Sequence, residues 1–352
     1  MKLPLPPDFF APVRLSHEET AQLQMVEAQL LDAYLDRYEE CALGNNGAVE
    51  GKHWKFVRQR DGVRVYKRRT RRRMWPHHDQ ENDRRGRQIE HSHLPGILIV
   101  GSVEGTVEDI LYGTMWDSRE DRMARAYFTG DGIADAAVLH TLEGATTLDP
   151  FRSLAVKWTL KKAPTASVLV KDRDFCFLGS TGVIRTQNGD KVGYELRHSI
   201  KFPSCPRFEN SSVVRAQMYF CSFFRQLKNG RVEVFHQGSY DASGDLLSML
   251  ATKSAVASFA NFTKILDCSF AKKLMRAIRR SEEREEAMSI SSAQESVDDE
   301  RRCGMCLSRL GSALKRKCAV CRHYAERSPG NIAHQSARAL LLQVVCGEGA
   351  AR

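Results

Sequence analysis

Residues 153–162, SLAVKWTLKK, show the alternation of side chains that decides the fold. Leu154, Val156, Trp158 and Leu160 occupy every second position, so in an extended strand they share one face. Four more strand-like segments follow: DFCFLGSTGVI (174–184), VGYELRHSIKF (192–202), VVRAQMYFCSFFRQL (213–227) and RVEVFHQGSYD (231–241). The connections at 187–190 and 228–230 are short and rich in turn residues, which predicts antiparallel neighbours.

The preceding residues add two kinds of element. A helix is predicted over 16–41, because Ser16 and Glu19 make a capping box ahead of an apolar stripe at helical spacing. Residues 54–66 read as two strands around the turn at Asp61-Gly62, and 96–105 as an apolar strand. Two helical pieces follow, over 106–116 with Thr106 at the cap and over 117–128.

The longest helical pattern spans residues 245–280. Its apolar positions recur every three or four residues: Val256, Phe259, Phe262, Leu266, Phe270, Leu274 and Ile278. A helix with so wide an apolar face must lie on something apolar, most simply the face of the sheet. The sequence therefore predicts an α+β fold, in which this helix lies against an antiparallel sheet. A strongly curved sheet under a long helix often encloses a cavity, and an apolar cavity binds apolar ligands.

Composition sets the broad class of protein. The chain has 352 residues and a net charge of +10, so it is long enough for two domains and favours an acidic partner such as a nucleic acid, an anionic membrane or a phosphorylated ligand. Its first residues lack the apolar core of a secretory signal, and no stretch has the length of a membrane span. We therefore expect a cytoplasmic protein with reduced cysteines.

The basic run KRRTRRR at 67–73 has two interpretations. Such a run serves nuclear import or nucleic-acid binding in some proteins. The favoured alternative is a solvated edge strand or loop, because lysine and arginine protect exposed edges from aggregation.

The order of several segments resembles a known family. These segments are DGVRVYKR (61–68) after Trp54, GTVEDILYGTMW (105–116), PFRSLAVKWTLKKAP (150–164), KDRDFCF (171–177), VVRAQMY (213–219) and YDASGDLLSML (240–250). Together they resemble the steroidogenic-acute-regulatory-related lipid-transfer (START) family over residues 50–280. They are most similar to START-like proteins of the oomycete type, in which a FYVE-type zinc finger follows this domain.

The resemblance implies a helix-grip fold whose curved antiparallel sheet surrounds the C-terminal helix. It also implies that one lipid or sterol molecule binds in the hydrophobic cavity and that the protein is not an enzyme. Candidate cavity residues are the strand residues Trp158, Arg173, His198, Gln217 and His236. Each of the polar four has the alternative of facing solvent or satisfying the backbone, and for Arg173 a structural ion pair with Asp174 is favoured.

A cysteine-rich segment follows the polar linker 281–302. Cys303-x-x-Cys306 and Cys318-x-x-Cys321 have zinc-ligand chemistry, because four thiolates complete a tetrahedral shell. The segment 303–324 resembles the first half of a FYVE-type finger, but the later cysteine pairs and the lipid-reading motifs of that family are absent. Three interpretations stay open: one zinc on the four cysteines, a zinc shared with His323, His334 or Cys346, or a truncated, partly disordered remnant. An altered reading frame or splice after Tyr324 is one cause of such a remnant.

The sequence as a whole predicts five segments. They are an N-terminal helical segment (1–49), a START-like lipid-binding domain (50–280), a polar linker (281–302), a partial FYVE-like finger with one zinc ion (303–324) and a divergent, disordered tail (325–352). The predicted function is intracellular binding of a lipid or sterol, with transfer or sensing left open. We also expect the protein to dock at an anionic membrane surface, endosomal or other. The alternative is a zinc-containing scaffold or a nuclear, nucleic-acid-binding protein that uses residues 67–73, although nucleic acid is the disfavoured partner.

Overall fold

The computed structural model describes residues 3–44, 49–60, 62–69, 94, 96–163, 170–208, 212–243 and 262–291. The chain divides into two compact units, Met1–Leu266 and Asp267–Arg352, with the boundary inside the last helix. The four predicted zinc ligands and residues 70–73 of the basic run lie outside the described residues.

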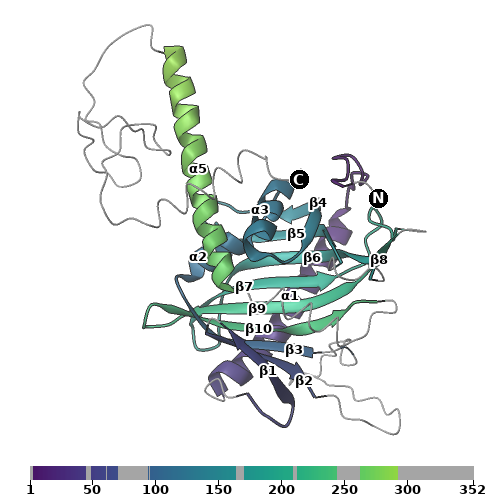
Figure 1. The fold of residues 1–352 in the computed structure, drawn as a ribbon, viewed down its shortest axis with the longest axis vertical. Helices are drawn as coiled ribbons and strands as arrows, with labels where there is room; N and C mark the ends of the chain where they lie inside the picture. Colours follow the sequence, from purple (N-terminus) through teal and green to yellow (C-terminus); the bar gives the residue numbers. More distant parts are fainter. Residues whose placement is uncertain are drawn as a thin grey trace. The chain divides into compact units, whose positions relative to one another are not determined.

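Ten strands of the first unit form one sheet (Figure 1). Their order is β1-β2-β3-β10-β9-β7-β6-β5-β4, with β8 beside β6. The bounds are β1 Trp54–Arg60, β2 Val63–Arg68, β3 Gly96–Glu104, β4 Ile133–Glu143, β5 Ser153–Lys161, β6 Asp172–Arg185, β7 Lys191–Ser199, β8 Val213–Arg215, β9 Gln217–Gln226 and β10 Arg231–Asp241. All neighbours pair antiparallel except β6 and β8, which are parallel.

The helices within the described residues are α1 His17–Tyr38, followed by a short π-helix η1 Glu39–Gly44, then α2 Val107–Thr114, α3 Arg119–Thr129 and α5 Phe262–Ser291. Two of them, α1 and α2, begin directly after the caps predicted at Ser16 and Thr106. Ser16 forms the predicted capping box with Glu19, and Thr106 accepts a hydrogen bond from the Asp109 backbone amide. Ser118 caps α3 in the same way, and Gly130 ends that helix in the left-handed conformation.

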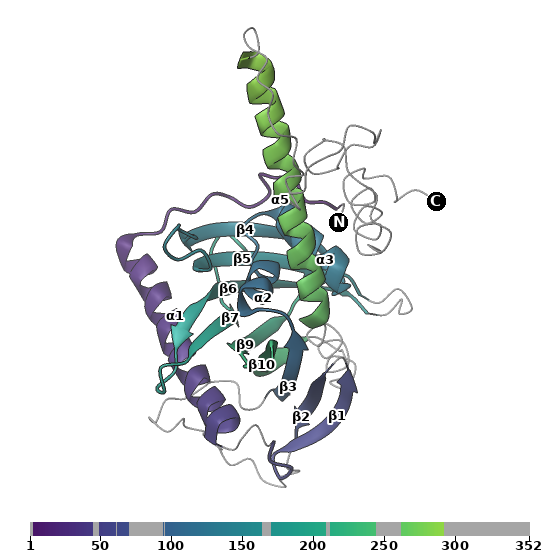
Figure 2. The ribbon, with the colours of Figure 1, turned by 90° about the vertical axis from the view of Figure 1, so that its left-hand side faces the viewer.

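Alternation along the strands divides the core between the two faces of the sheet. In β3, Ile97 and Ile99 pack in a cluster with α2, whereas Leu98 and Val100 pack in a cluster with α1. Helices α1 and α2 therefore cover opposite faces (Figure 2). The first turn of α5 belongs to the α2 side, because Phe262 and Ile265 join that cluster.

The predicted stripe of β5 packs on the face away from α2. Leu154, Val156, Trp158 and Leu160 form a third cluster, against which apolar residues of the N-terminal segment pack. The N-terminal segment thus covers this part of the sheet, and the odd-numbered residues of β5 point toward the α2 and α3 side.

The α+β fold class is confirmed, with differences in detail. The segment 213–227 is not one strand, because β8 and β9 are separated at Ala216. Strand β4 was not predicted, since its register shifts between Ile133 and Asp135 and at two later points interrupt any simple alternation. Helix α5 also continues to Ser291, so the predicted linker begins inside a helix.

Candidate ligand cavity

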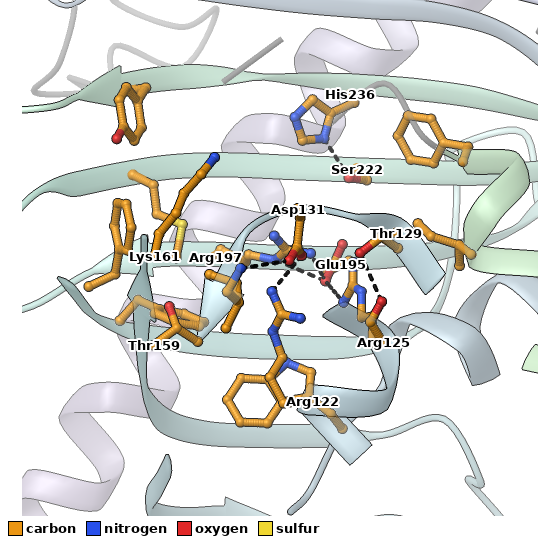
Figure 3. Close-up of a pocket in the computed structure, with 18 residues that line it drawn as sticks. Arg122, Arg125, Thr129, Asp131, Thr159, Lys161, Glu195, Arg197, Ser222 and His236 are labelled. Carbon is orange, nitrogen blue, oxygen red and sulfur yellow. Dashed lines mark hydrogen bonds and ion pairs between the residues drawn. The ribbon is translucent and has the colours of Figure 1, made fainter. Parts of the chain in front are cut away.

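A cavity of about 70 Å³ lies against the α2 and α3 face of the sheet, within the first unit. Strands β5, β6, β7, β9 and β10 contribute to its wall, together with α3 and the first turn of α5 (Figure 3). Its apolar lining consists of Trp116, Ile133, Phe175, Phe177, Met218, Tyr240, Phe262 and Ile265. This volume has room for a few water molecules, because one water molecule needs a cavity of roughly 10–15 Å³.

The polar part of the cavity is built from two short sequence patterns. Arg122 and Arg125 are three residues apart on α3, so both side chains lie on the same helical face. Glu195 and Arg197 are two apart on β7, so they share a face of the sheet. Figure 3 shows these side chains converging with Asp131, which follows the C-terminal turn of α3.

The converging side chains form three ion pairs, two of which share Glu195. Glu195 Oε1 lies 3.1 Å from Arg125 Nη1 and 2.9 Å from Arg197 Nε. Arg122 Nη2 donates to Asp131 Oδ2 at 2.6 Å. All five side chains are largely removed from water, which strengthens their attraction and makes an uncompensated charge costly.

The acids of this cluster are ionised at neutral pH. Burial by itself raises the pKa of Glu195, but the charges of Arg197 and Arg125 outweigh burial and lower that pKa to about 2. Burial opposes Arg122 and Arg125 in the same way at Asp131, whose pKa is also about 2. Neither carboxylate can therefore serve as a proton donor near pH 7.

Positive charge exceeds negative charge along the cavity wall. The basic residues of its described lining are Arg122, Arg125, Lys161 and Arg197, and the acidic ones are Asp131 and Glu195. Burial lowers the pKa of Lys161, as expected where a cation is removed from water. The Nη1 atom of Arg122 is buried without a hydrogen-bond acceptor. The cavity is thus prepared electrostatically for an anionic or strongly hydrogen-bond-accepting group.

His236 is the one predicted cavity residue that lines this site. Its Nδ1 atom lies 2.7 Å from Ser222 Oγ, and its ring stacks on Phe220 with centroids 4.9 Å apart. Burial, together with the nearby charge of Arg197, lowers its pKa to about 3. The imidazole is therefore neutral at pH 7 and is too weak a base to activate the serine hydroxyl.

The structure places the other four predicted residues elsewhere. Trp158 lies on the opposite face, where its ring packs 5.1 Å from Phe10 and its Nε1 donates to Asp174 Oδ2 at 2.9 Å. His198 and Gln217 line a second cavity of about 390 Å³. Alternation along a strand places every second side chain on a common face of the sheet, but it does not say which face carries the cavity.

The predicted ion pair between Arg173 and Asp174 is wrong, because neighbouring strand residues point to opposite faces. Arg173 Nε instead donates to the Ala242 carbonyl at 2.8 Å. The partner of Asp174 is Arg215, whose Nη2 lies 2.8 Å from Asp174 Oδ2.

The sequence interpretation did not identify the ionic cluster. Two signals were available: arginines three residues apart on a capped helix, and a glutamate–arginine pair on one face of an otherwise apolar strand. Charged residues at core-facing positions of buried elements are rare unless they are paired, so they mark a site.

Among the described residues, no three His, Cys, Asp or Glu side chains come together in a way that could hold a metal ion. Within the same part of the chain, no helix combines the length and the apolar character needed to cross a bilayer.

The chain matches no known family in a family-level comparison and no curated protein. Among solved structures it is similar to human StAR-related lipid transfer protein 5, with 18% identity, a TM-score of 0.46, and coverage of 70% of this chain and 98% of that one. Human STARD10 is similar at 14% identity and a TM-score of 0.42, with coverage of 75% of this chain and 84% of that one. A STAR-related lipid transfer protein fragment from Xanthomonas axonopodis is similar at 16% identity and a TM-score of 0.38, with coverage of 61% of this chain and 96% of that one. Similarities of this size carry no functional argument for the chain.

Proposed function

We propose that this protein binds a single lipid or other amphiphile in the cavity between the sheet and the first turn of α5. The observation that supports the proposal is a buried ionic cluster next to an apolar wall, in a domain whose sequence resembles the START family. The apolar wall would take the hydrocarbon part, at roughly 0.8 kcal/mol per buried methylene. The cluster around Arg122, Arg125 and Arg197 would take the polar head.

Binding requires the cavity to enlarge. A lipid-sized ligand needs a site of roughly 300–1,000 Å³, and the cavity has about 70 Å³. The closed form is therefore the ligand-free state in this proposal. Phe262 and Ile265 of the first α5 turn are the apolar wall that would move, because they close the site without belonging to the sheet.

Binding without catalysis is the expected outcome. The carboxylates of the cluster are ionised and held by arginines, and His236 is a weak base. These groups can orient a head group by charge and hydrogen bonding, but they are poorly suited to move protons at neutral pH.

The experiment is lipid capture by the full-length protein. The protein is incubated with vesicles of mixed phospholipids and sterol, re-isolated, and examined by native mass spectrometry and lipid extraction. We expect near-unit occupancy for the wild type and a loss of at least about tenfold for Met218→Trp, whose new side chain would fill the cavity. Met25→Trp is the matched control, because Met25 is exposed on α1.

Two results would contradict the proposal. One is a wild type that captures no lipid, which would favour the scaffold or nucleic-acid alternative. The other is a Met218→Trp protein that keeps its cooperative melting transition and still binds lipid as the wild type does. A variant that has lost its melting transition would be replaced by Thr159→Trp, since Thr159 lines the same cavity.

Docking at an anionic membrane is a second part of the proposal. The net charge of +10 favours it, because each lysine or arginine close to an anionic surface contributes on the order of 1 kcal/mol. Co-sedimentation with phosphatidylcholine vesicles should rise when phosphatidylserine is added and fall at high salt. Equal binding to both vesicle types would contradict docking, but it would not contradict lipid binding in the cavity.

We also propose one zinc ion on Cys303, Cys306, Cys318 and Cys321. The support is their spacing alone, which suits a tetrahedral thiolate site. Metal analysis of the purified protein should give one zinc per chain, and Cys303→Ser with Cys318→Ser should abolish it. Two zinc ions, or none, would contradict this assignment.

A further inference from the structure

Two cysteines meet at the second cavity. Cys176 lies on β6, and Cys205 lies in the connection between β7 and β8. Both are buried, with exposed fractions of 1% and 2%, yet both line the cavity of about 390 Å³. Their thiols are close enough for each to shift the ionisation of the other. The cavity gives a small solute a route to a thiol pair that is otherwise shielded.

Arg215 supplies a positive charge at one of the two sulfurs. Its Nη2 lies 3.5 Å from Cys205 Sγ, and its Nη1 donates to the Cys205 carbonyl at 3.2 Å. The guanidinium is held in place because Nε donates to the buried carboxylate of Asp174 at 2.9 Å. An arginine fixed beside a sulfur favours the thiolate over the thiol.

The rest of the cavity wall is basic as well. His198, Lys201 and Arg207 line it with Arg215, and its described lining contains no acidic side chain. Asp174, which is not in this lining, is paired with Arg215. The charged side chains of the described lining are therefore all basic.

The two thiols differ in acidity as a result. The hydrogen bond from Cys176 and the charge of Arg215 lower the pKa of Cys205 against the effect of burial. The same hydrogen bond, together with burial, raises the pKa of Cys176. Burial also raises the pKa of Cys221 and of Cys41, so these two are not activated in this way. Because Arg215 lies 3.5 Å from Cys205 Sγ, Cys205 has the position of an attacking cysteine and Cys176 that of a resolving one.

We propose that Cys176 and Cys205 form a redox-sensitive dithiol, in which hydrogen peroxide oxidises Cys205 and Cys176 then closes a disulfide. In the first step the Cys205 thiolate attacks a peroxide oxygen, the O–O bond breaks and hydroxide leaves, which gives a sulfenic acid. In the second step the Cys176 sulfur attacks the Cys205 sulfur, and the oxygen leaves as water after taking a proton. One peroxide is reduced to two waters while two thiols become one disulfide.

The disulfide would fasten the β7–β8 connection to β6. That connection is attached to the sheet by Arg215, which also donates to the Pro206 carbonyl at 3.0 Å. A covalent link would restrict its motion and reshape the second cavity. The inference does not depend on lipid binding in the first cavity.

The test is thiol mapping on the full-length reduced protein. Hydrogen peroxide is added at pH 7, the reaction is quenched with N-ethylmaleimide, and non-reduced tryptic peptides are identified by mass spectrometry. Cys176 and Cys205 fall in separate peptides, DFCFLGSTGVIR and FPSCPR, each with one cysteine, so a link between them is unambiguous. We expect that linked pair to appear while Cys221, in AQMYFCSFFR, remains a free thiol.

Variants separate the two roles. Cys176→Ser should leave a sulfenic acid on Cys205 that dimedone traps, and Cys205→Ser should leave Cys176 reduced. Cys221→Ser is the matched control and should form the link as the wild type does. Two results would overturn the proposal: recovery of Cys205 as a free thiol at peroxide doses that oxidise Cys221, or linkage of Cys205 to other cysteines in preference to Cys176.

Discussion

At the scale of single residues, Glu195 carries the charge balance of the cavity. It is buried between Arg125 and Arg197, and these two cations would lose their shared counter-ion in Glu195→Gln. Removing one partner of a buried ionic group typically costs about 3–5 kcal/mol. We expect Glu195→Gln to lower the free energy of unfolding at pH 7 by that order, as measured by urea denaturation.

The pH dependence of this effect has a definite sign. Arg197 and Arg125 hold the pKa of Glu195 at about 2, below its usual value of 4.5, so ionised Glu195 contributes stability above roughly pH 5 that is lost as the pH falls toward 2. The contribution is on the order of 3 kcal/mol. The difference in unfolding free energy between the wild type and Glu195→Gln should therefore become smaller as the pH falls below 5. A difference in unfolding free energy between wild type and Glu195→Gln that stays constant from pH 5 to pH 2 would contradict the assignment.

Residue-level prediction from the sequence is confirmed where local rules apply, whereas the lining of a cavity depends on tertiary geometry that the sequence pattern does not give. The caps at Ser16 and Thr106 follow from residues within three positions, and both are present. Of the five predicted cavity residues only His236 lines the first cavity. Whether a strand residue lines this cavity depends on which face of the sheet it points to. The metal assignment of the four cysteines stays a prediction.

At the scale of elements, the close approach of α2 to the first turn of α5 depends on Gly113. A Cβ at that position would lie 2.2 Å from the Ile265 carbonyl oxygen, too close for any contact. Gly113→Ala should destabilise the protein by about 1–3 kcal/mol through this overlap, although alanine in a helix is intrinsically favoured over glycine by roughly 1 kcal/mol. Gly144→Ala, which meets open space, is the control and should change the melting temperature little. Equal melting temperatures for both variants would show that α2 and the first turn of α5 have room for a methyl group between them at Gly113.

Helix α1 is attached to the sheet by a buried polar group rather than by apolar contacts alone. Arg152 Nη1 lies 2.6 Å from Glu27 Oε1, which also accepts a hydrogen bond from the Tyr194 hydroxyl at 3.1 Å. In a double-mutant cycle, Glu27→Gln and Arg152→Met should each cost several kcal/mol, and the double variant less than their sum, with a coupling energy of about 1–3 kcal/mol. The exposed pair Lys52–Glu50 should couple far more weakly. Additive losses at Glu27 and Arg152 would mean that the two side chains act independently.

The elements also show why sequence patterns identify some strands better than others. Strand β5 keeps a regular register with β6, and β10 keeps one with β9, so their alternation is readable. Strand β4 pairs with repeated irregularities, and β8 is short and parallel, so neither presents the period of two that the prediction relies on. The helical period likewise located α5 but not its end, because the polar residues beyond 280 continue the helix without an apolar stripe.

At the scale of the whole molecule, the boundaries of the lipid-binding part can be tested by shortening the chain. Phe262 and Ile265 are buried in the first unit and line the cavity, although they begin a helix that continues to Ser291. A chain ending at residue 261 would expose the apolar cluster beneath them and open the cavity to water. We expect it to melt at a lower temperature than the full chain and to capture no lipid.

A chain ending at Ser291 provides the matched comparison. It keeps the whole of α5 and removes the cysteine-rich segment, which the predicted domain division places outside the lipid-binding part. If that division is right, this chain should melt like the full-length protein and capture lipid at the same occupancy in native mass spectrometry. Loss of lipid from the chain ending at Ser291 would mean that residues 292–352 contribute to the site. Retention by the chain ending at residue 261 would mean that the cavity does not need α5, and it would remove the first turn of that helix from the proposed opening movement.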